Sequence, residues 1–143
     1  MIALATCSYS EYHPDMGAPV RASLGTPKWF SYPLPASWLN AAPDGWMLNV
    51  DYDKYRRAYF SKLDKIGIDR LRGDLEHIAD AYTALNGTRP DRLVILCYEG
   101  LRNPQKWCHR TMFAEWWEAQ TGEHVPELGA TCPAPAPQPP TLF

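Results

Sequence analysis

The sequence predicts a single α/β domain, in which a mixed, largely parallel sheet has helices packed on its faces. Two observations indicate this class. Short apolar runs that suit strands alternate with longer segments whose apolar residues recur every three or four positions, as on one face of a helix. The chain has 143 residues, enough for one hydrophobic core and short for two. We expect the domain over residues 1–128 and a proline-rich extended tail over 129–143.

The first part of the chain is expected to hold two strands and a long loop. Residues 2–7 form an apolar run that suits a first, central strand. A second strand is expected over residues 18–24. Residues 27–45 are rich in proline and aromatic side chains, which favours an ordered but irregular loop. A brief strand is expected over residues 46–50.

Two consecutive helices are expected next. Apolar and aromatic residues at positions 52, 55, 59, 60 and 63 share one helical face, and Gly67 interrupts the pattern. In the second helix, Asp69 is the expected N-cap, and Asn86-Gly87 marks the end. Apolar residues at 68, 71, 75, 78 and 82 form the face that is expected to cover the sheet.

The last elements are a buried strand and an aromatic helix. Five uninterrupted apolar residues, 93–97, indicate a strand buried on both faces. Apolar residues at 112, 113, 116 and 117 recur at helical spacing, so a helix is expected from about Cys108 to Gly122. Residues 124–128 are expected to add a short edge strand.

Reactive side chains concentrate where this strand ends and this helix begins. Cys97 and Glu99 leave the strand, and Cys108, His109 and Arg110 open the helix. In α/β sheets, the loops at the carboxyl ends of parallel strands border a crevice into which helix N–H groups point. We therefore expect a functional site at this junction. The alternative is that both cysteines only fill the core.

One hypothesis for this site is thiolate chemistry. Helix N–H groups and the neighbouring His109 and Arg110 favour the thiolate of Cys108, which can attack an electrophile. Glu99 is its expected partner. Successive residues on a helix point about 100° apart, so at most two of the three residues 108–110 can face one substrate atom.

A second hypothesis is an anion clamp. Arg110 and the helix N-terminus would hold a phosphate. Neighbouring loops would add positive charge from Arg21, Lys28, Arg102 and Lys106. Such a site suits a phosphate-bearing small molecule or the end of a nucleic acid. The net charge of −2 argues against the strongly basic balance of nonspecific nucleic-acid binders.

A third hypothesis is a zinc site. Cys97, Cys108 and His109 offer suitable ligands, and Cys7 would supply a fourth. Because the chain has no CxxC pair, we expect no cofactor and keep zinc as a minor alternative. The four cysteines lack the spacing of a secreted disulfide framework. With neither a membrane-length apolar run nor a signal-peptide pattern, reduced thiols and a cytoplasmic location are expected, with no membrane partner.

Several of these residues resemble a known family. Residues 94–114, with Cys97-Tyr98-Glu99 and then Cys108-His109-Arg110 at the head of a helix, resemble domain of unknown function 488. Two further segments of that family are similar to Thr6-Cys7-Ser8-Tyr9-Ser10 and Pro19-Val20-Arg21. The chain as a whole is short and has an aromatic helix containing Trp116-Trp117, and in this it is similar to family members carried by actinobacteria and their phages. The resemblance implies an α/β domain that gathers the following residues at one end of the sheet: Tyr9, Arg21, Glu99, Cys108, His109 and Arg110.

The expected function is that of a small enzyme, a transferase or hydrolase acting on a nucleotide- or nucleic-acid-related, phosphate-bearing substrate. The candidate catalytic residues are Cys108, His109, Glu99 and Cys97. The candidate ligand-binding residues are Arg110, Arg21, Tyr9, Ser8 and Lys28. The alternative is a noncatalytic module that binds a nucleotide or a protein in the same crevice, so the sequence leaves open whether the chain is an enzyme.

Overall fold

A computed structural model of the chain describes residues 2–98 and 108–129. Within these ranges, one sheet contains β1 (Ala3–Ser8), β2 (Ala18–Arg21) and β3 (Arg92–Cys97). The α-helices are α1 (Tyr52–Ile66), α2 (Ile68–Asn86) and α3 (His109–Thr121). Short 3-10 helices, η1 (Pro14–Met16), η2 (Leu39–Ala41) and η3 (Gly45–Asn49), lie in the connections. The predicted α/β class is confirmed.

The sheet is built around β3. The strand order is β1-β3-β2, and both outer strands run parallel to β3. Residues 2–7 were expected to form a central strand, but the observed strand β1 lies beside the central strand β3. Since parallel strands end at the same edge of a sheet, Ser8 of β1 lies opposite Cys97 of β3.

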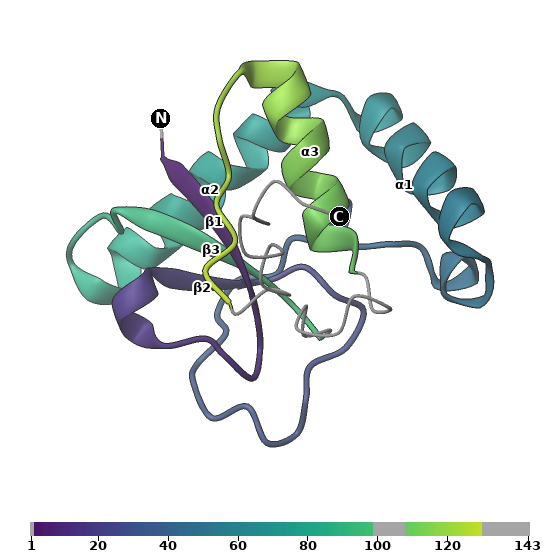
Figure 1. Cartoon of the computed structure of the whole chain (residues 1–143). Coiled ribbons are helices and arrows are strands. Elements are labelled where there is room, and N and C mark those ends of the chain that lie inside the picture. Colours follow the sequence, from purple (N-terminus) through teal and green to yellow (C-terminus); the bar gives the residue numbers. More distant parts are fainter. Residues whose placement is uncertain (1, 99–107, 130–143) are drawn as a thin grey trace, which may run out of the picture.

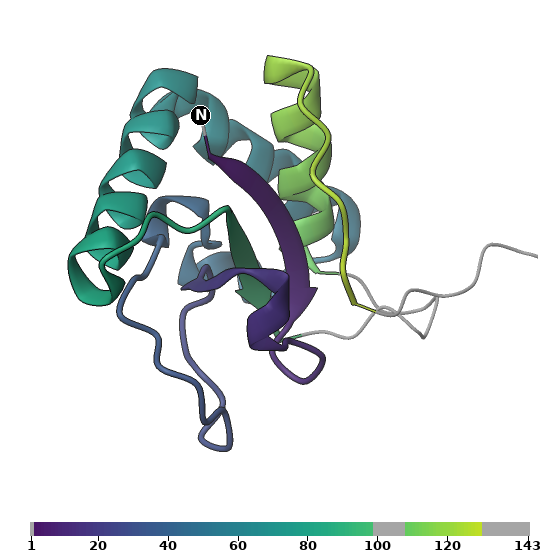
Figure 2. The same cartoon turned by 90° about the vertical axis from the view of Figure 1, so that its left-hand side faces the viewer.

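The three α-helices pack on one face of the sheet (Figures 1 and 2). Their buried side chains form one apolar cluster with four strand residues, Leu4, Val20, Leu93 and Ile95. The opposite face is covered by η1 and by the long loop after β2. Only nine residues, 9–17, connect β1 to β2. A crossover helix between parallel strands needs about a dozen residues or more, so this connection is too short to place an α-helix on that face.

The helix ends follow signals that are visible in the sequence. The Asp51 side chain caps α1 by accepting a backbone N–H, and Gly67 ends the helix. Gly87 and Gly122, both in the left-handed conformation, end α2 and α3. Asp69 lies in the first turn of α2 instead of at its N-cap, because Gly67 occupies the N-cap.

Three short segments differ from their predictions. Residues 46–50 do not form a strand, and most of them belong to η3. The second strand ends at Arg21, which also forms an isolated parallel bridge with Ser37. The expected edge strand at 124–128 is reduced to a parallel bridge between Thr6 and Glu127. These segments are too short for alternation alone to identify their structure.

None of the described helices is long and apolar enough to cross a membrane. Glu99 and the proline-rich tail beyond Gly129 lie outside the described residues.

Substitution of Gly17 tests the tight contact between η1 and β3. Gly17 has a φ of 137°, and a Cβ atom on it would lie 2.6 Å from the carbonyl oxygen of Arg92. Both the backbone conformation and the lack of space oppose a side chain, so we expect Gly17→Ala to lower the free energy of unfolding by about 2–4 kcal/mol. Urea denaturation followed by tryptophan fluorescence measures this change.

Gly73→Ala is the matched control for this experiment. Gly73 lies within α2, and a Cβ atom there would meet nothing within 4 Å. Alanine is expected to raise the free energy of unfolding by about 0.5–1 kcal/mol because it restricts the unfolded chain. Equal effects of the two substitutions would contradict the described packing at Gly17.

Candidate functional site

The carboxyl end of β3 lies against the N-terminus of α3, as the sequence led us to expect. Cys97 is the last residue of β3, and Cys108 is the N-cap of α3. Their sulfur atoms lie within bonding distance, as in a disulfide. Both residues are buried, with exposed fractions of 4% and 3%. The junction therefore places a sulfur pair at the carboxyl edge of the sheet.

The His109 ring lies beside both sulfur atoms. Its Nδ1 is 3.5 Å from Sγ of Cys97 and 3.7 Å from Sγ of Cys108. Its Nε2 is 2.5 Å from the carbonyl oxygen of Ala22, directly after β2. A carbonyl oxygen can only accept a hydrogen bond, so the proton lies on Nε2 and Nδ1 directs a lone pair toward the sulfur atoms. The Ala22 carbonyl thereby selects the tautomer of the ring.

Burial keeps the His109 ring neutral. Removal of the ring from water lowers the pKa of His109 to about 4, against the opposing effect of its hydrogen bond to Ala22. The positive charges of Arg110 and Lys62 lower this pKa further. At neutral pH, the His109 ring is therefore uncharged, and the lone pair of its Nδ1 faces the sulfur atoms.

Arg110 forms an ion pair with Glu127. The guanidinium is fully buried, and its Nε donates to Oε1 of Glu127 at 2.8 Å. The hydroxyl of Thr6 donates to the same oxygen at 2.8 Å, and the Gly129 N–H donates to Oε2 at 3.1 Å. Glu127 thus connects α3 to β1 and to the segment that follows α3. The sequence reasoning did not identify Glu127, although an arginine beside the apolar face of a helix calls for a carboxylate partner.

Arg21 and Tyr9 both form hydrogen bonds with the loop that follows β2. The Arg21 guanidinium donates to the carbonyl oxygens of Ser23 at 3.0 Å and Leu24 at 2.6 Å. The buried Tyr9 hydroxyl lies 2.6 Å from Oγ of Ser23. Both predicted ligand-binding residues thus lie near the carboxyl edge, where they hold the loop that carries the Ala22 carbonyl.

The remaining candidate residues have separate surroundings. Ser8 is buried at the end of β1 and donates to the Glu11 carboxylate at 2.9 Å. Lys28 is exposed on the loop after β2. Cys7, the suggested fourth zinc ligand, packs on the face of the sheet opposite the helices. Burial raises the pKa of the Cys7 thiol to about 11. Glu99 has no described position.

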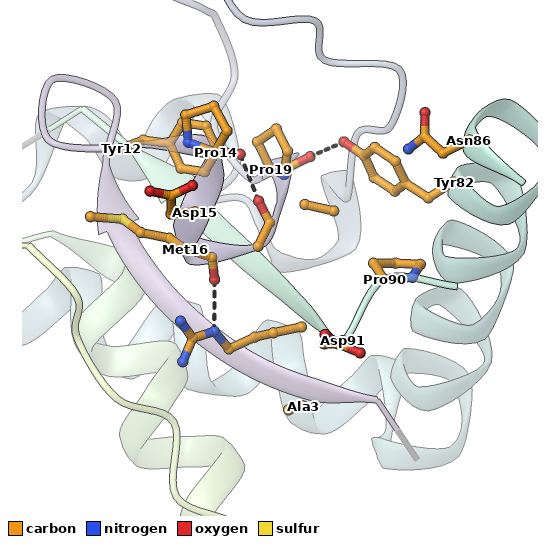
Figure 3. A pocket seen from close by; sticks show the side chains of 13 residues that line it. Ala3, Tyr12, Pro14, Asp15, Met16, Pro19, Tyr82, Asn86, Pro90 and Asp91 are labelled. Atoms are coloured by element: carbon orange, nitrogen blue, oxygen red, sulfur yellow. Dashed lines mark hydrogen bonds between the residues drawn. The ribbon is translucent and has the colours of Figure 1, made fainter. Parts of the chain in front are cut away.

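A hollow of about 710 Å³ lies at the other end of the sheet (Figure 3). Its lining includes Ala3, Ala18 and Arg92, which lie at or next to the starts of the three strands. Two of its polar side chains form hydrogen bonds with backbone carbonyls. Arg92 Nε donates to the Met16 carbonyl at 2.8 Å, and the Tyr82 hydroxyl donates to the Pro19 carbonyl. The sulfur pair and this hollow are therefore at opposite ends of β3, and the chemically reactive groups are not in the hollow.

Comparison with known proteins yields no match to a family model, to a curated protein or to a solved structure. What the fold and the site define is a class: an α/β protein with a buried Cys-Cys-His cluster at the carboxyl edge of a parallel sheet. The relationship to domain of unknown function 488 stays a prediction from the motif residues.

The buried imidazole predicts a pH-dependent stability of the metal-free protein. Between pH 6.5 and about 4, the unfolded chain binds a proton that folded His109 does not bind. Stability is therefore lost as the pH falls through this window, by at most about 3.5 kcal/mol at about 1.4 kcal/mol per pH unit. Urea denaturation between pH 4 and 7 measures the slope.

Two substitutions distinguish the contribution of His109 to this slope from that of other titratable groups. His109→Gln keeps an N–H donor for the Ala22 carbonyl and cannot titrate, so it should lose most of the slope. His77→Gln changes an exposed residue of α2 and should retain the slope. An unchanged slope in His109→Gln would show that another group is responsible.

The ion pair between Arg110 and Glu127 predicts a large effect of removing its carboxylate. Glu127→Ala withdraws the acceptor of a fully buried guanidinium, so we expect the free energy of unfolding to fall by about 3–5 kcal/mol. The matched control is Glu115→Ala, because Glu115 pairs with Arg56 at the surface, with side chains 55% and 34% exposed. That change should cost less than about 1 kcal/mol. Comparable losses in thermal and urea denaturation would contradict the buried role of Glu127.

Proposed function

We propose that this protein is a thiol-dependent redox enzyme whose Cys97–Cys108 pair exchanges with thiols and disulfides. The observation that carries the proposal is the pairing of Cys97, at the end of a strand, with Cys108, at the N-cap of a helix. A thiolate at such a position is stabilised by the helix N–H groups. The proposal gives a specific chemistry to the cysteine-dependent enzyme that the sequence led us to expect.

Cys108 is the attacking sulfur in this scheme. As the N-cap of the 13-residue helix α3, it lies at the positive end of the helix dipole. Its carbonyl oxygen accepts hydrogen bonds from the Thr111 N–H and hydroxyl, at 3.1 and 2.8 Å. These bonds fix the main chain at the N-cap. Cys97 is the partner that resolves the mixed disulfide.

The exchange reaction is balanced with a small disulfide RSSR as the oxidant of the reduced pair. The Cys108 thiolate attacks one sulfur of RSSR, the S–S bond of RSSR breaks, and a mixed disulfide forms as the first RS⁻ leaves. The Cys97 thiolate then attacks Sγ of Cys108, which forms the Cys97–Cys108 bond and releases the second RS⁻. Two electrons pass from the two protein thiolates to RSSR, and two small thiolates reverse both steps and reduce the pair again.

His109 is a positioning residue in this scheme. Its neutral Nδ1 accepts a hydrogen bond from a protein S–H, which orients the reduced thiols toward each other. The Ala22 carbonyl holds the ring for this purpose. Because both cysteines are largely buried, a low-molecular-weight disulfide is a better substrate than the surface of a folded protein.

The broader function expected from the sequence remains a prediction. A nucleotide- or nucleic-acid-related substrate would need free cationic groups beside Cys108. Of the two arginines assigned to phosphate, Arg110 is paired with Glu127 and Arg21 binds loop carbonyls. These contacts do not favour a phosphate site over thiol exchange, so we retain thiol exchange as the proposal.

A redox titration tests the proposed function. The variant C7S/C132S leaves Cys97 and Cys108 as the only cysteines and is equilibrated in glutathione buffers of increasing oxidised fraction. We expect both thiols to become protected from alkylation in a single two-electron transition, as determined by mass spectrometry of the intact protein. The reduced protein should also reduce a small aromatic disulfide.

Single substitutions supply the controls. Cys108→Ser and Cys97→Ser should each abolish the two-electron transition, whereas Cys7→Ser alone should leave it unchanged because Cys7 lies on the other face of the sheet. Two thiols that stay reduced in every buffer would exclude the proposal. So would a disulfide that small thiols cannot reduce in the folded protein.

A further inference from the structure

We infer that, in its reduced form, the same cluster is a zinc site formed by Sγ of Cys97, Sγ of Cys108 and Nδ1 of His109. The three ligand atoms lie within 4.8 Å of one another, and all three residues are buried. The inference rests on the proposed function in one respect, namely that the cysteine pair must be reducible. It does not require exchange with a substrate.

The position of the His109 nitrogen fits a tetrahedral ion. Zinc binds sulfur at about 2.3 Å and imidazole nitrogen at about 2.0 Å, which at the tetrahedral angle places the nitrogen about 3.5 Å from each sulfur. The observed distances from Nδ1 are 3.5 Å to Cys97 and 3.7 Å to Cys108. The nitrogen is therefore already at ligand spacing from both sulfur atoms.

The other ring nitrogen is bound as it usually is in a metal-binding histidine. A metal-bound imidazole almost always donates its second N–H to a carboxylate, a carbonyl or water, which fixes the ring and its tautomer. In this protein Nε2 donates to the Ala22 carbonyl at 2.5 Å. The lone pair of Nδ1 consequently faces the sulfur atoms, which is the orientation that coordination requires.

The cysteines must be reduced before an ion can enter. Two sulfur ligands of a tetrahedral zinc ion lie about 3.8 Å apart, which is incompatible with an S–S bond. The Cα atoms of Cys97 and Cys108 are 7.1 Å apart. This spacing lies just beyond the range of about 4.4–6.8 Å that is usual for disulfides, so the main chain leaves room for the sulfur atoms to separate once the bond is reduced.

Charge also favours a zinc ion in this buried position. Two thiolates neutralise the double positive charge of zinc, whereas two buried thiolates without an ion would repel each other in a medium of low polarity. The N-terminus of α3 adds stabilisation for the Cys108 thiolate. The neutral His109 ring supplies a third ligand without changing this balance.

Zinc binding and the disulfide exclude each other. A small disulfide RSSR oxidises the two zinc-bound thiolates, so that the Cys97–Cys108 bond forms, zinc leaves as Zn²⁺ and two RS⁻ are released. Within residues 2–98 and 108–129, the cluster supplies three of the four ligands that zinc takes. The fourth position is then available to water or to an added thiolate.

Metal titration of the full-length chain tests the inference. The C7S/C132S variant is reduced with a phosphine, freed of metal and titrated anaerobically with Co²⁺ and then Zn²⁺. We expect one equivalent to bind, with the thiolate-to-cobalt absorption and visible bands of a tetrahedral site. Cys97→Ser, Cys108→Ser and His109→Gln in the same background should each weaken binding by about 100-fold or more. The control variant Glu115→Ala changes a surface ion pair and should bind both ions as tightly as the parent variant does.

X-ray absorption of the zinc-loaded C7S/C132S variant requires no substitution of a ligand. This measurement therefore tests the inference even if a ligand variant fails to fold. Two sulfur neighbours and at least one nitrogen neighbour are expected. Failure of the reduced protein to bind either ion would overturn the inference, as would a zinc environment without sulfur or binding that is unaffected by all three ligand substitutions.

The two proposals for this site fail separately. A protein that exchanges its disulfide with glutathione but binds no zinc overturns the zinc site and supports thiol exchange. A protein that binds zinc through the two cysteines but forms no disulfide in oxidising glutathione supports the zinc site and overturns thiol exchange.

Discussion

The parallel pairing of β3 with both of its neighbours is the constraint on which the rest of this structure depends. It brings the carboxyl ends of three strands to one edge. Ser8 and Cys97 are the last residues of β1 and β3, and Ala22 directly follows β2. Helix α3 then begins at that edge with Cys108. A backbone carbonyl after β2, a thiol at the end of β3 and a helix N-terminus are thus brought together from three distant parts of the chain.

The two residues after Cys108 have different tasks because successive helical side chains point in different directions. His109 points toward the sulfur pair, and Arg110 points toward Glu127 beside β1. Within the Cys-His-Arg triplet, Cys108 and His109 therefore belong to the candidate site, whereas Arg110 has a structural role. The ion pair of Arg110 anchors the helix whose first residues hold the site, so the stability of the domain and the geometry of the cluster are linked.

The two proposals for the cluster, thiol exchange and zinc binding, depend on the same thiols. Sulfur atoms held close enough to bond can cycle between a dithiol and a disulfide, and the neutral imidazole beside them can accept a hydrogen bond or bind a metal ion. The Ala22 carbonyl contributes to both, since it determines which nitrogen carries the proton. The surrounding redox conditions would then decide whether the site holds a disulfide or zinc.

The sequence by itself determined the elements that are long and strongly patterned: the three helices, the buried strand ending at Cys97 and the meeting of that strand with the helix of Cys108. It also pointed to Cys97, Cys108 and His109, because these residue types stand next to element ends. Only the tertiary structure decided that β3 is the central strand, that Cys7 lies on the opposite face, and that Glu127 and the Ala22 carbonyl are the partners of Arg110 and His109. The physical reason is that periodicity reports which face of an element is buried, whereas strand order and long-range polar partners depend on how the elements meet in space, which no local pattern encodes.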